Sequence, residues 1–109
     1  MTTLRFDPDP RAVINPWEVD SPLERCPRTV VSCFARNLME YAAERYGGEK
    51  ICEIEFANMA LPLWRIQAHG AALGLTMTFQ GAPNAVSQYE SLFALGVERV
   101  LVFGTCGVL

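Results

Sequence analysis

The last third of the chain, residues 76–109, constrains the fold more than any other stretch, because turn glycines separate its apolar runs. Apolar side chains occupy every second position from 73 to 79, which is the spacing of a half-buried strand. They then recur at helical spacing over residues 85–93, and Gly96 ends that pattern. A second apolar run covers residues 100–103. Two strands joined through a helix predict a βαβ unit, whose strands are usually parallel.

Both glycine turns follow the carboxyl ends of these expected strands. Gly81 stands two residues before Pro83 in the first turn, and the sequence GTCG at residues 104–107 forms the second. In open α/β sheets, ligands bind beyond the carboxyl ends of the strands. Glycine turns bring backbone amides close to a bound anion, and the hydroxyl of Thr105 adds a donor. If the chain binds a small molecule, the site is expected at these turns, and the candidate residues are Gly81, Gly104, Thr105 and Gly107.

The rest of the chain extends this unit into a larger sheet. A β-branched run follows Pro27, and two longer runs flank His69-Gly70, a dipeptide that favours a hairpin turn. A helical pattern ends at Gly47-Gly48, which suits the left-handed stop of a helix. The expected strands are 29–33, 51–56, 63–68, 71–79 and 100–103, and the expected helices are 35–46 and one that begins at Pro83. This order predicts an α/β fold with a mixed β-sheet flanked by helices.

Three elements have an expected inner face. On the first helix, the apolar side chains of one face are Leu38, Met39, Ala42 and Tyr46. On the second helix, they are Ala85, Val86, Tyr89, Leu92 and Phe93. Strand 51–56 alternates apolar residues with Glu53 and Glu55, so one of its faces is expected to be solvated.

Residues 1–27 form a proline-rich arm, since they hold five of the seven prolines of the chain. This composition predicts an extended segment with turns rather than a packed element. Val13, Ile14 and Trp17 are its candidate anchors, either on its own domain, which we favour, or on a neighbouring subunit. The remaining residues, 28–109, form the expected α/β domain.

Composition excludes several classes of function. The net charge of −3 predicts no basic patch and no nucleic-acid partner. No apolar run approaches the about 20 residues of a membrane helix, and no signal peptide begins the chain, so we expect a cytoplasmic protein without a membrane partner. The four cysteines form no C-x-x-C pair, which predicts reduced, mostly buried thiols and no metal site. No cofactor is expected.

The carboxyl-terminal motifs resemble a known family. From Trp64 to Leu109, the order of G-x-P, a helix with Glu90, A-L-G, a strand and G-T-C-G resembles the nucleoside phosphorylase superfamily, which includes purine and uridine phosphorylases and related nucleosidases. The run into FGTCGVL resembles one bacterial subgroup, and a weaker match extends back to Thr29. The resemblance implies αβα layers and pentosyl transfer, in which phosphate cleaves the N-glycosidic bond of a nucleoside. It also implies that the GTCG turn contacts phosphate and sugar, with Thr105 as the first candidate.

Members of this superfamily are roughly twice as long as the 109 residues here, as complete domains of this kind are. The resemblance therefore implies that residues 28–109 are an amino-terminal half of such a domain, a half-length version of the layered fold. We expect the lone chain to be inactive or nearly so. Its partners are expected to be a nucleoside, inorganic phosphate, and either further copies in a homo-oligomer or a chain that supplies the missing half. An exposed apolar sheet edge should make the isolated chain self-associate.

Three positions where phosphorolytic relatives carry arginine are neutral in this chain. They fall on Val102, Asn37 and Met59, while Arg36 lies one residue out of step. Cys33 stands where relatives have a glycine at the end of the first strand, so Arg36 and Cys33 are secondary site candidates. Each charged hydrogen bond to phosphate contributes roughly 1.5–3 kcal/mol, so these replacements predict weak phosphate binding.

Two alternatives follow from these departures. A hydrolytic nucleosidase would use water in place of phosphate and would not need the arginines. A non-catalytic binding subunit, or a truncated relic, would keep the fold alone. No catalytic residue is assigned, because the family's acids and bases lie outside these residues. Of the other candidates, His69 is expected to be a polar turn residue, and Cys33 and Cys106 are expected to be buried, inert thiols.

Overall fold

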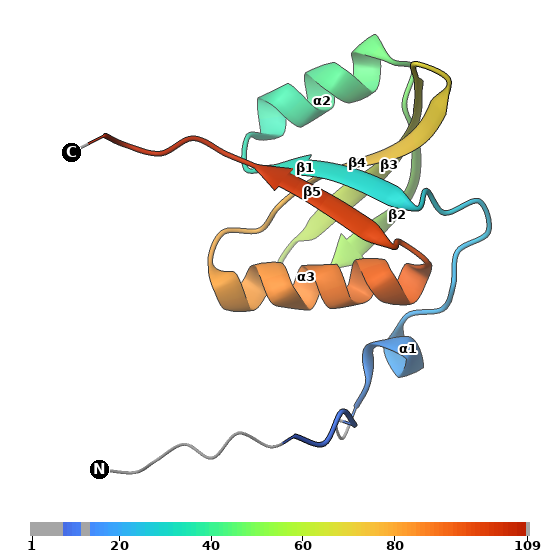
Figure 1. Cartoon of the computed structure of the whole chain (residues 1–109), viewed down its shortest axis with the longest axis vertical. Coiled ribbons are helices and arrows are strands. Elements are labelled where there is room, and N and C mark those ends of the chain that lie inside the picture. Colours follow the sequence, from blue (N-terminus) through green and yellow to red (C-terminus); the bar gives the residue numbers. More distant parts are fainter. Residues whose placement is uncertain (1–7, 12–13, 109) are drawn as a thin grey trace.

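The computed structural model describes residues 8–11 and 14–108 of the chain. Its helices are α1 (Pro16–Val19), α2 (Arg36–Arg45) and α3 (Ala82–Leu95), and its strands are β1 (Thr29–Cys33), β2 (Glu49–Glu55), β3 (Ala60–Ala68), β4 (Ala71–Met77) and β5 (Arg99–Phe103). The strands form one sheet in the order β2-β3-β4-β1-β5 (Figure 1). Apart from α1, the element order is the one that the sequence predicts.

The sheet is mixed, which confirms the predicted α/β class. β1 runs parallel to both β4 and β5, whereas β2, β3 and β4 pair antiparallel with one another in turn. The expected βαβ unit is β4-α3-β5, but β1 lies between its two strands. Buried parallel strands have near-continuous apolar runs, and the TVVSC run of β1 fits the centre of the parallel part.

The two longer helices cover opposite faces of the sheet, so the molecule has three layers (Figure 1). On the α2 side, Met39 and Ala43 pack with Cys33, Leu75 and Met77. On the α3 side, the packed core residues include Leu92, Leu95, Val30 and Leu63. Each apolar helix stripe is thereby removed from water by the sheet, which is the main stabilising term in such layers.

The hairpin between β3 and β4 turns at His69 and Gly70, as predicted. Both residues have positive φ, 52° and 79°, which is the pattern of a two-residue hairpin turn that follows strand twist. His69 is therefore a turn residue. β3 begins at Ala60, three residues earlier than predicted, although Pro62 lacks a backbone donor. The Pro62 carbonyl instead accepts a 2.8 Å hydrogen bond from the Thr76 hydroxyl on β4.

The predicted inner face of α2 is partly wrong. Met39 and Ala43 are the buried residues, whereas Leu38 and Tyr46 are 45% and 43% exposed. Tyr46 is the residue that caps the carboxyl end of α2, and Gly47 after it, with φ of 62°, turns the chain away from the helix. Tyr46 therefore does not face the sheet. Leu38 lies over the carboxyl end of β1, where the helix does not cover the sheet fully.

The predicted inner face of α3 is wrong at two positions. Val86 and Phe93 are 56% and 50% exposed, whereas the polar Gln88 is fully buried beside Leu92. The helix starts at Ala82, with Gly81 before it and Pro83 at its second position, and ends at Gly96. Apolar spacing alone did not identify Gln88, because its burial depends on hydrogen bonds to β4.

The described part of the N-terminal arm contains one turn of helix, α1, where the sequence predicted no packed element. The carboxylate of Glu18 accepts a 2.7 Å hydrogen bond from the backbone N–H of Asn15, which caps this turn. Side chains of α1 and α3 lie against each other at one surface pocket, formed by Pro10, Asn15, Pro16, Trp17, Glu90, Phe93 and Ala94. The arm thus rests on its own domain at α1, with Trp17 and Ile14 mostly exposed. Val13 lies outside the described residues.

β5 is an edge strand of the sheet, and its apolar side chains are only partly covered. Leu101, Val102 and Phe103 are 61%, 37% and 45% exposed. No helix within the described residues is long and apolar enough to cross a membrane.

Candidate functional site

The carboxyl ends of β1 and β4 form a crevice because the chain leaves them toward opposite faces of the sheet. After β1 the chain enters α2 on one face, and after β4 it enters α3 on the other (Figure 1). Adjacent parallel strands whose connections diverge in this way leave a crevice that binds ligands in α/β proteins. Thr78 N–H donates a 2.8 Å hydrogen bond to the Cys33 carbonyl and closes the floor between the two strands.

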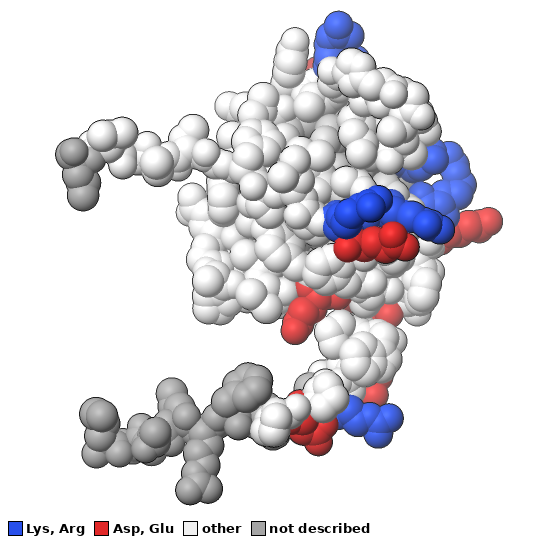
Figure 2. Space-filling view, in the orientation of Figure 1, with Lys and Arg blue, Asp and Glu red and all other residues white. Residues whose placement is uncertain are grey.

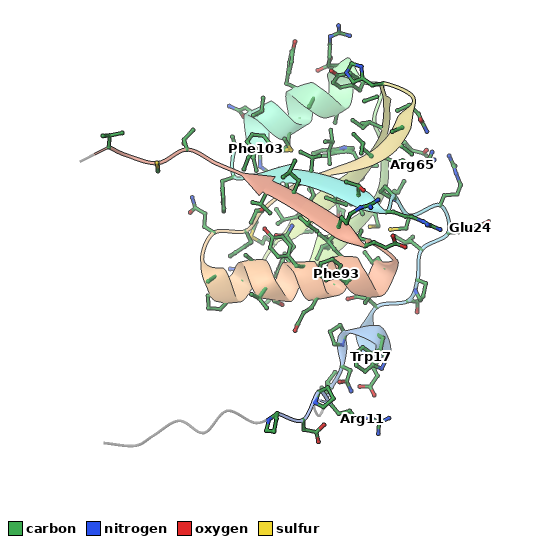
Figure 3. All side chains as sticks on the ribbon, in the orientation of Figure 1. Arg11, Trp17, Glu24, Arg65, Phe93 and Phe103 are labelled. Carbon is green, nitrogen blue, oxygen red and sulfur yellow. The ribbon has the colours of Figure 1, made fainter. Side chains whose placement is uncertain are left out.

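One pocket of about 380 Å³ lies at this crevice and extends to the end of β5. This volume lies within the range of roughly 300–1,000 Å³ typical of small-molecule sites. Its lining comes from the ends of β1 and β5, the start of α2 and the turn before α3: Cys33, Phe34, Ala35, Leu38, Gln80, Phe103, Gly104 and Thr105. Figure 3 shows Phe103 at the end of β5 that is nearest to α2.

A second pocket, of about 290 Å³, adjoins the first and shares Phe34 and Gln80 with it. Arg36 and Met59 contribute to its lining. The guanidinium of Arg36 lies 3.4 Å from the Glu40 carboxylate in an exposed ion pair, so it is not directed freely into either pocket. The Glu40 carboxylate therefore offsets part of the charge that Arg36 would present to an anion.

The structure brings some of the predicted site residues together and leaves others apart. Gly104, Thr105 and Cys33 line the first pocket, and Arg36 lines the adjoining one. Gly81 lines neither; its φ of 91° turns the chain into α3 and so positions the neighbouring Gln80. Gly107 is exposed and lies outside both linings. The ligand-binding roles of these residues stay predictions.

Gly104 allows a close approach of an aromatic ring. A Cβ at this position would lie 3.2 Å from the Phe34 ring, closer than most real Cβ contacts. The glycine therefore lets the turn after β5 lie against the segment after β1, and this contact narrows the pocket on one side.

Gln88 holds the turn that carries Gln80. Its side-chain amide donates to the Met77 carbonyl at 2.6 Å and accepts from the Phe79 N–H at 2.9 Å. Beside it, the hydroxyls of Ser32 and Thr78 lie 2.6 Å apart, and the Thr78 hydroxyl lies 3.0 Å from that of Tyr89. These bonds connect β1, β4 and α3, and thereby fix the rim of the pocket.

Sequence patterns missed five of the lining residues: Phe34, Ala35, Leu38, Gln80 and Phe103. Phe34 and Phe103 are 48% and 45% exposed, which is more than is usual for large aromatic side chains. A large aromatic at the last position of a strand, or just after it, was the available signal. Its meaning depended on knowing that β1 and β5 are neighbours.

The lining of the first pocket carries no charged side chain at neutral pH. In Figure 2, no Lys or Arg is visible around the carboxyl end of β5. Cys33 is the single titratable group of the lining, and its thiol lies 3.7 Å from the Ala35 carbonyl. A search of the described residues found no group of three or more His, Cys, Asp or Glu side chains that could hold a metal.

All four cysteines are free thiols, but the expectation that most are buried is wrong. Cys33 alone is buried, and Cys106 is exposed in the segment after β5. Burial raises the pKa of Cys52 to about 11, with smaller contributions from Cys26, Asp20 and Glu53, and burial also raises the pKa of Cys26. These two thiols therefore stay protonated and unreactive at neutral pH.

The structure is an α/β fold with a pocket at the carboxyl ends of its parallel strands. In comparisons with known proteins, no family model and no curated protein matched this chain. The ligand must therefore be inferred from the pocket and the motifs themselves.

Proposed function

We propose that the pocket at the carboxyl ends of β1, β4 and β5 binds a nucleoside, and that the protein is nucleoside phosphorylase-like, acting in pentosyl transfer to phosphate. One observation carries the proposal. Gln80, beside Gly81, and the turn at Gly104 and Thr105 lie around a single pocket, although 24 positions separate Gln80 from Gly104 in the sequence. This is the meeting of turns that the resembled family requires.

The chemistry of the lining suits a nucleoside. The exposed rings of Phe34 and Phe103 offer apolar surfaces on which a base can stack, and every base has such a face. The Gln80 amide offers both a donor and an acceptor to the polar edge of a base. Backbone amides at Gly104 and Thr105, with the Thr105 hydroxyl, offer donors to sugar oxygens.

The lining lacks the groups that glycosidic cleavage needs. A leaving base requires a general acid or a strong hydrogen-bond donor, and water requires a general base. Neither Asp, Glu nor His occurs in the two pocket linings. We therefore expect these residues to bind a nucleoside with little or no turnover by the chain alone.

The uncharged lining also supports a second candidate, hydrolysis by water. Phosphorolysis needs cationic donors for phosphate, and Arg36, paired with Glu40, is the sole cation in the two linings. A third candidate, a non-catalytic binding subunit, requires the nucleoside site alone. Because little turnover is expected, product analysis needs high protein concentration and long incubation, with and without inorganic phosphate. Traces of ribose 1-phosphate support phosphorolysis, traces of free ribose support hydrolysis, and binding without a trace of either product is the result expected of the third.

Replacing Thr105 with valine is expected to weaken nucleoside binding about 3- to 10-fold, because the substitution removes one hydroxyl and keeps the side-chain shape. A neutral hydrogen bond contributes roughly 0.5–1.5 kcal/mol, which corresponds to this range. Isothermal titration calorimetry with uridine and adenosine provides the measurement. Ser87→Ala on the exposed surface of α3 is the matched control and should leave affinity unchanged. Equal affinity in the Thr105→Val variant and the unmodified chain would remove Thr105 from the site.

We also propose that β5 is where the chain meets a further copy or a second chain. Its outer edge has no strand neighbour within the described residues, and Leu101 is 61% exposed. Open apolar edges favour strand pairing between molecules. Leu101→Lys should therefore lower the average mass measured by light scattering at equal concentration, whereas Val86→Lys on α3 should not. A monodisperse monomer before substitution would contradict this proposal.

A further inference from the structure

Four arginine side chains line one pocket at the amino ends of β1 and β5. They come from the segment before β1, from β3 and from β5: Arg25, Arg28, Arg65 and Arg99. The pocket measures about 420 Å³, and Cys26, Pro27, Thr29 and residues 71–73 complete it. Figure 2 shows Lys and Arg side chains gathered on this side of the molecule, where β1 and β5 begin. The sequence-based expectation of no basic patch is wrong here, because folding brings distant arginines together.

Acidic side chains lie next to this arginine cluster (Figure 2). None of the described residues that line the pocket is acidic. Glu98 lies 3.8 Å from Arg28 in an exposed ion pair. Glu49 lies opposite Arg65 in the ladder of β2 and β3, but no ion pair joins the two in the described part of the chain. Since like charges repel one another, an anion bound among these arginines would stabilise the cluster.

Arg65 provides the strongest evidence for a ligand. Its Nε is buried and has no hydrogen-bond partner among the described residues. Buried donors are almost always paired, and an unpaired one is costly, so the atom calls for an acceptor. Figure 3 shows Arg65 at the opposite end of the sheet from Phe103. Arg65 lines the arginine-lined pocket, which is the side from which an acceptor would approach its guanidinium.

Two neighbouring arginines, Arg99 and Arg25, are placed to contact the same ligand. Arg99 donates from Nε to the Thr29 hydroxyl at 3.2 Å, and this bond leaves its two terminal nitrogens for a ligand. Arg25 has a φ of 61°, a left-handed conformation that is uncommon for a residue other than glycine. Such backbone conformations recur at ligand sites, where they direct a side chain toward the ligand.

We propose that this pocket binds a phosphate group, either free inorganic phosphate or the phosphate of a small ester. Guanidinium groups match phosphate oxygens in pairs, and a phosphate carries nearly two charges and three terminal oxygens. A single carboxylate would neutralise fewer of the four arginines.

The site is separate from the proposed nucleoside pocket. Strands rise about 3.3 Å per residue, so the length of β1 places the two sites roughly 16 Å apart. A phosphate held at the arginine cluster is too far from the nucleoside pocket to attack a nucleoside there. Phosphate binding at this site does not depend on the function proposed above.

Isothermal titration calorimetry with inorganic phosphate and with glycerol 3-phosphate, in a low-salt buffer free of other oxyanions, tests the proposal. Both probes should bind, and Arg65→Gln should weaken each about tenfold or more, since a charged hydrogen bond is lost. Arg28→Gln should act in the same direction and also leaves Glu98 unpaired. Arg45→Gln, which removes an exposed arginine from α2, should change nothing. Tighter binding of the ester would identify an organic phosphate as the ligand, tighter binding of inorganic phosphate would identify the free ion, and equal binding would show that the phosphate group alone is recognised.

Arg28 is well exposed, so Arg28→Gln keeps the test valid if Arg65→Gln fails to fold. Two results would overturn the proposal. One is the absence of binding of both probes to the unmodified chain. The other is unchanged affinity in Arg28→Gln together with a folded Arg65→Gln.

Discussion

Replacing Gln88 with methionine is expected to destabilise the protein by roughly 2–5 kcal/mol, because the substitution leaves two buried backbone groups without partners. Gln88 is fully buried, and its amide bonds both the Met77 carbonyl and the Phe79 N–H. Methionine keeps the unbranched shape and size of the side chain, so most of the loss comes from hydrogen bonding. Urea unfolding gives the free-energy difference. A change within about 0.5 kcal/mol, the range of ordinary surface substitutions, would contradict this role for Gln88.

Gln88→Glu provides a pH-dependent control for the same site. A neutral carboxyl can accept from the Phe79 N–H and donate to the Met77 carbonyl, whereas the ionised form is buried with no donor for that carbonyl. Burial raises the pKa of this carboxyl in the folded state above its value of about 4.3 in the unfolded chain. The stabilising contribution should be fully present below the unfolded pKa and be lost as the pH rises through the folded pKa.

Gly74→Ala is expected to destabilise the protein by about 1–3 kcal/mol, because β4 has no room for a side chain at this position. A Cβ there would lie 2.7 Å from Val30 Cγ2 and 2.9 Å from Pro27 Cγ. Val30 on β1 is fully buried and cannot move aside without disturbing that strand. Thermal unfolding should show a lower Tm, by roughly 4–8 °C for each kcal/mol lost.

Gly107→Ala is the matched control for this substitution, since a Cβ at Gly107 would meet no atom within 4 Å. It should leave Tm unchanged. If Gly74→Ala also left Tm unchanged, the packing of Pro27 and Val30 against β4 would be wrong.

The strands and their order along the chain could be predicted because alternation and turn residues are local signals. His69-Gly70 predicted its hairpin from two residues, and Gly47 and Gly96 predicted where helices end. The inner faces of the helices were harder to predict from local signals. Leu38 and Phe93 are apolar and exposed, since Leu38 lines the pocket at the end of β1 and Phe93 lines the one beside α1.

The candidate site could be predicted only at the level of its turns. Gly104 and Thr105 were identified because a strand precedes them, but Phe34 and Phe103 gained meaning only when β1 was found beside β5. The arginine-lined pocket was beyond local patterns altogether. Its four residues come from three separate segments, and the overall charge of −3 concealed them.

Chemical-shift mapping of backbone amides during titration with uridine and adenosine tests most directly whether the pocket at the carboxyl ends of β1 and β5 binds a nucleoside. The account predicts shifts concentrated at Phe34, Gln80, Gly104 and Thr105, with none at Arg65 or Arg99. Saturable shifts elsewhere on the surface, or no shifts at millimolar nucleoside, would contradict it.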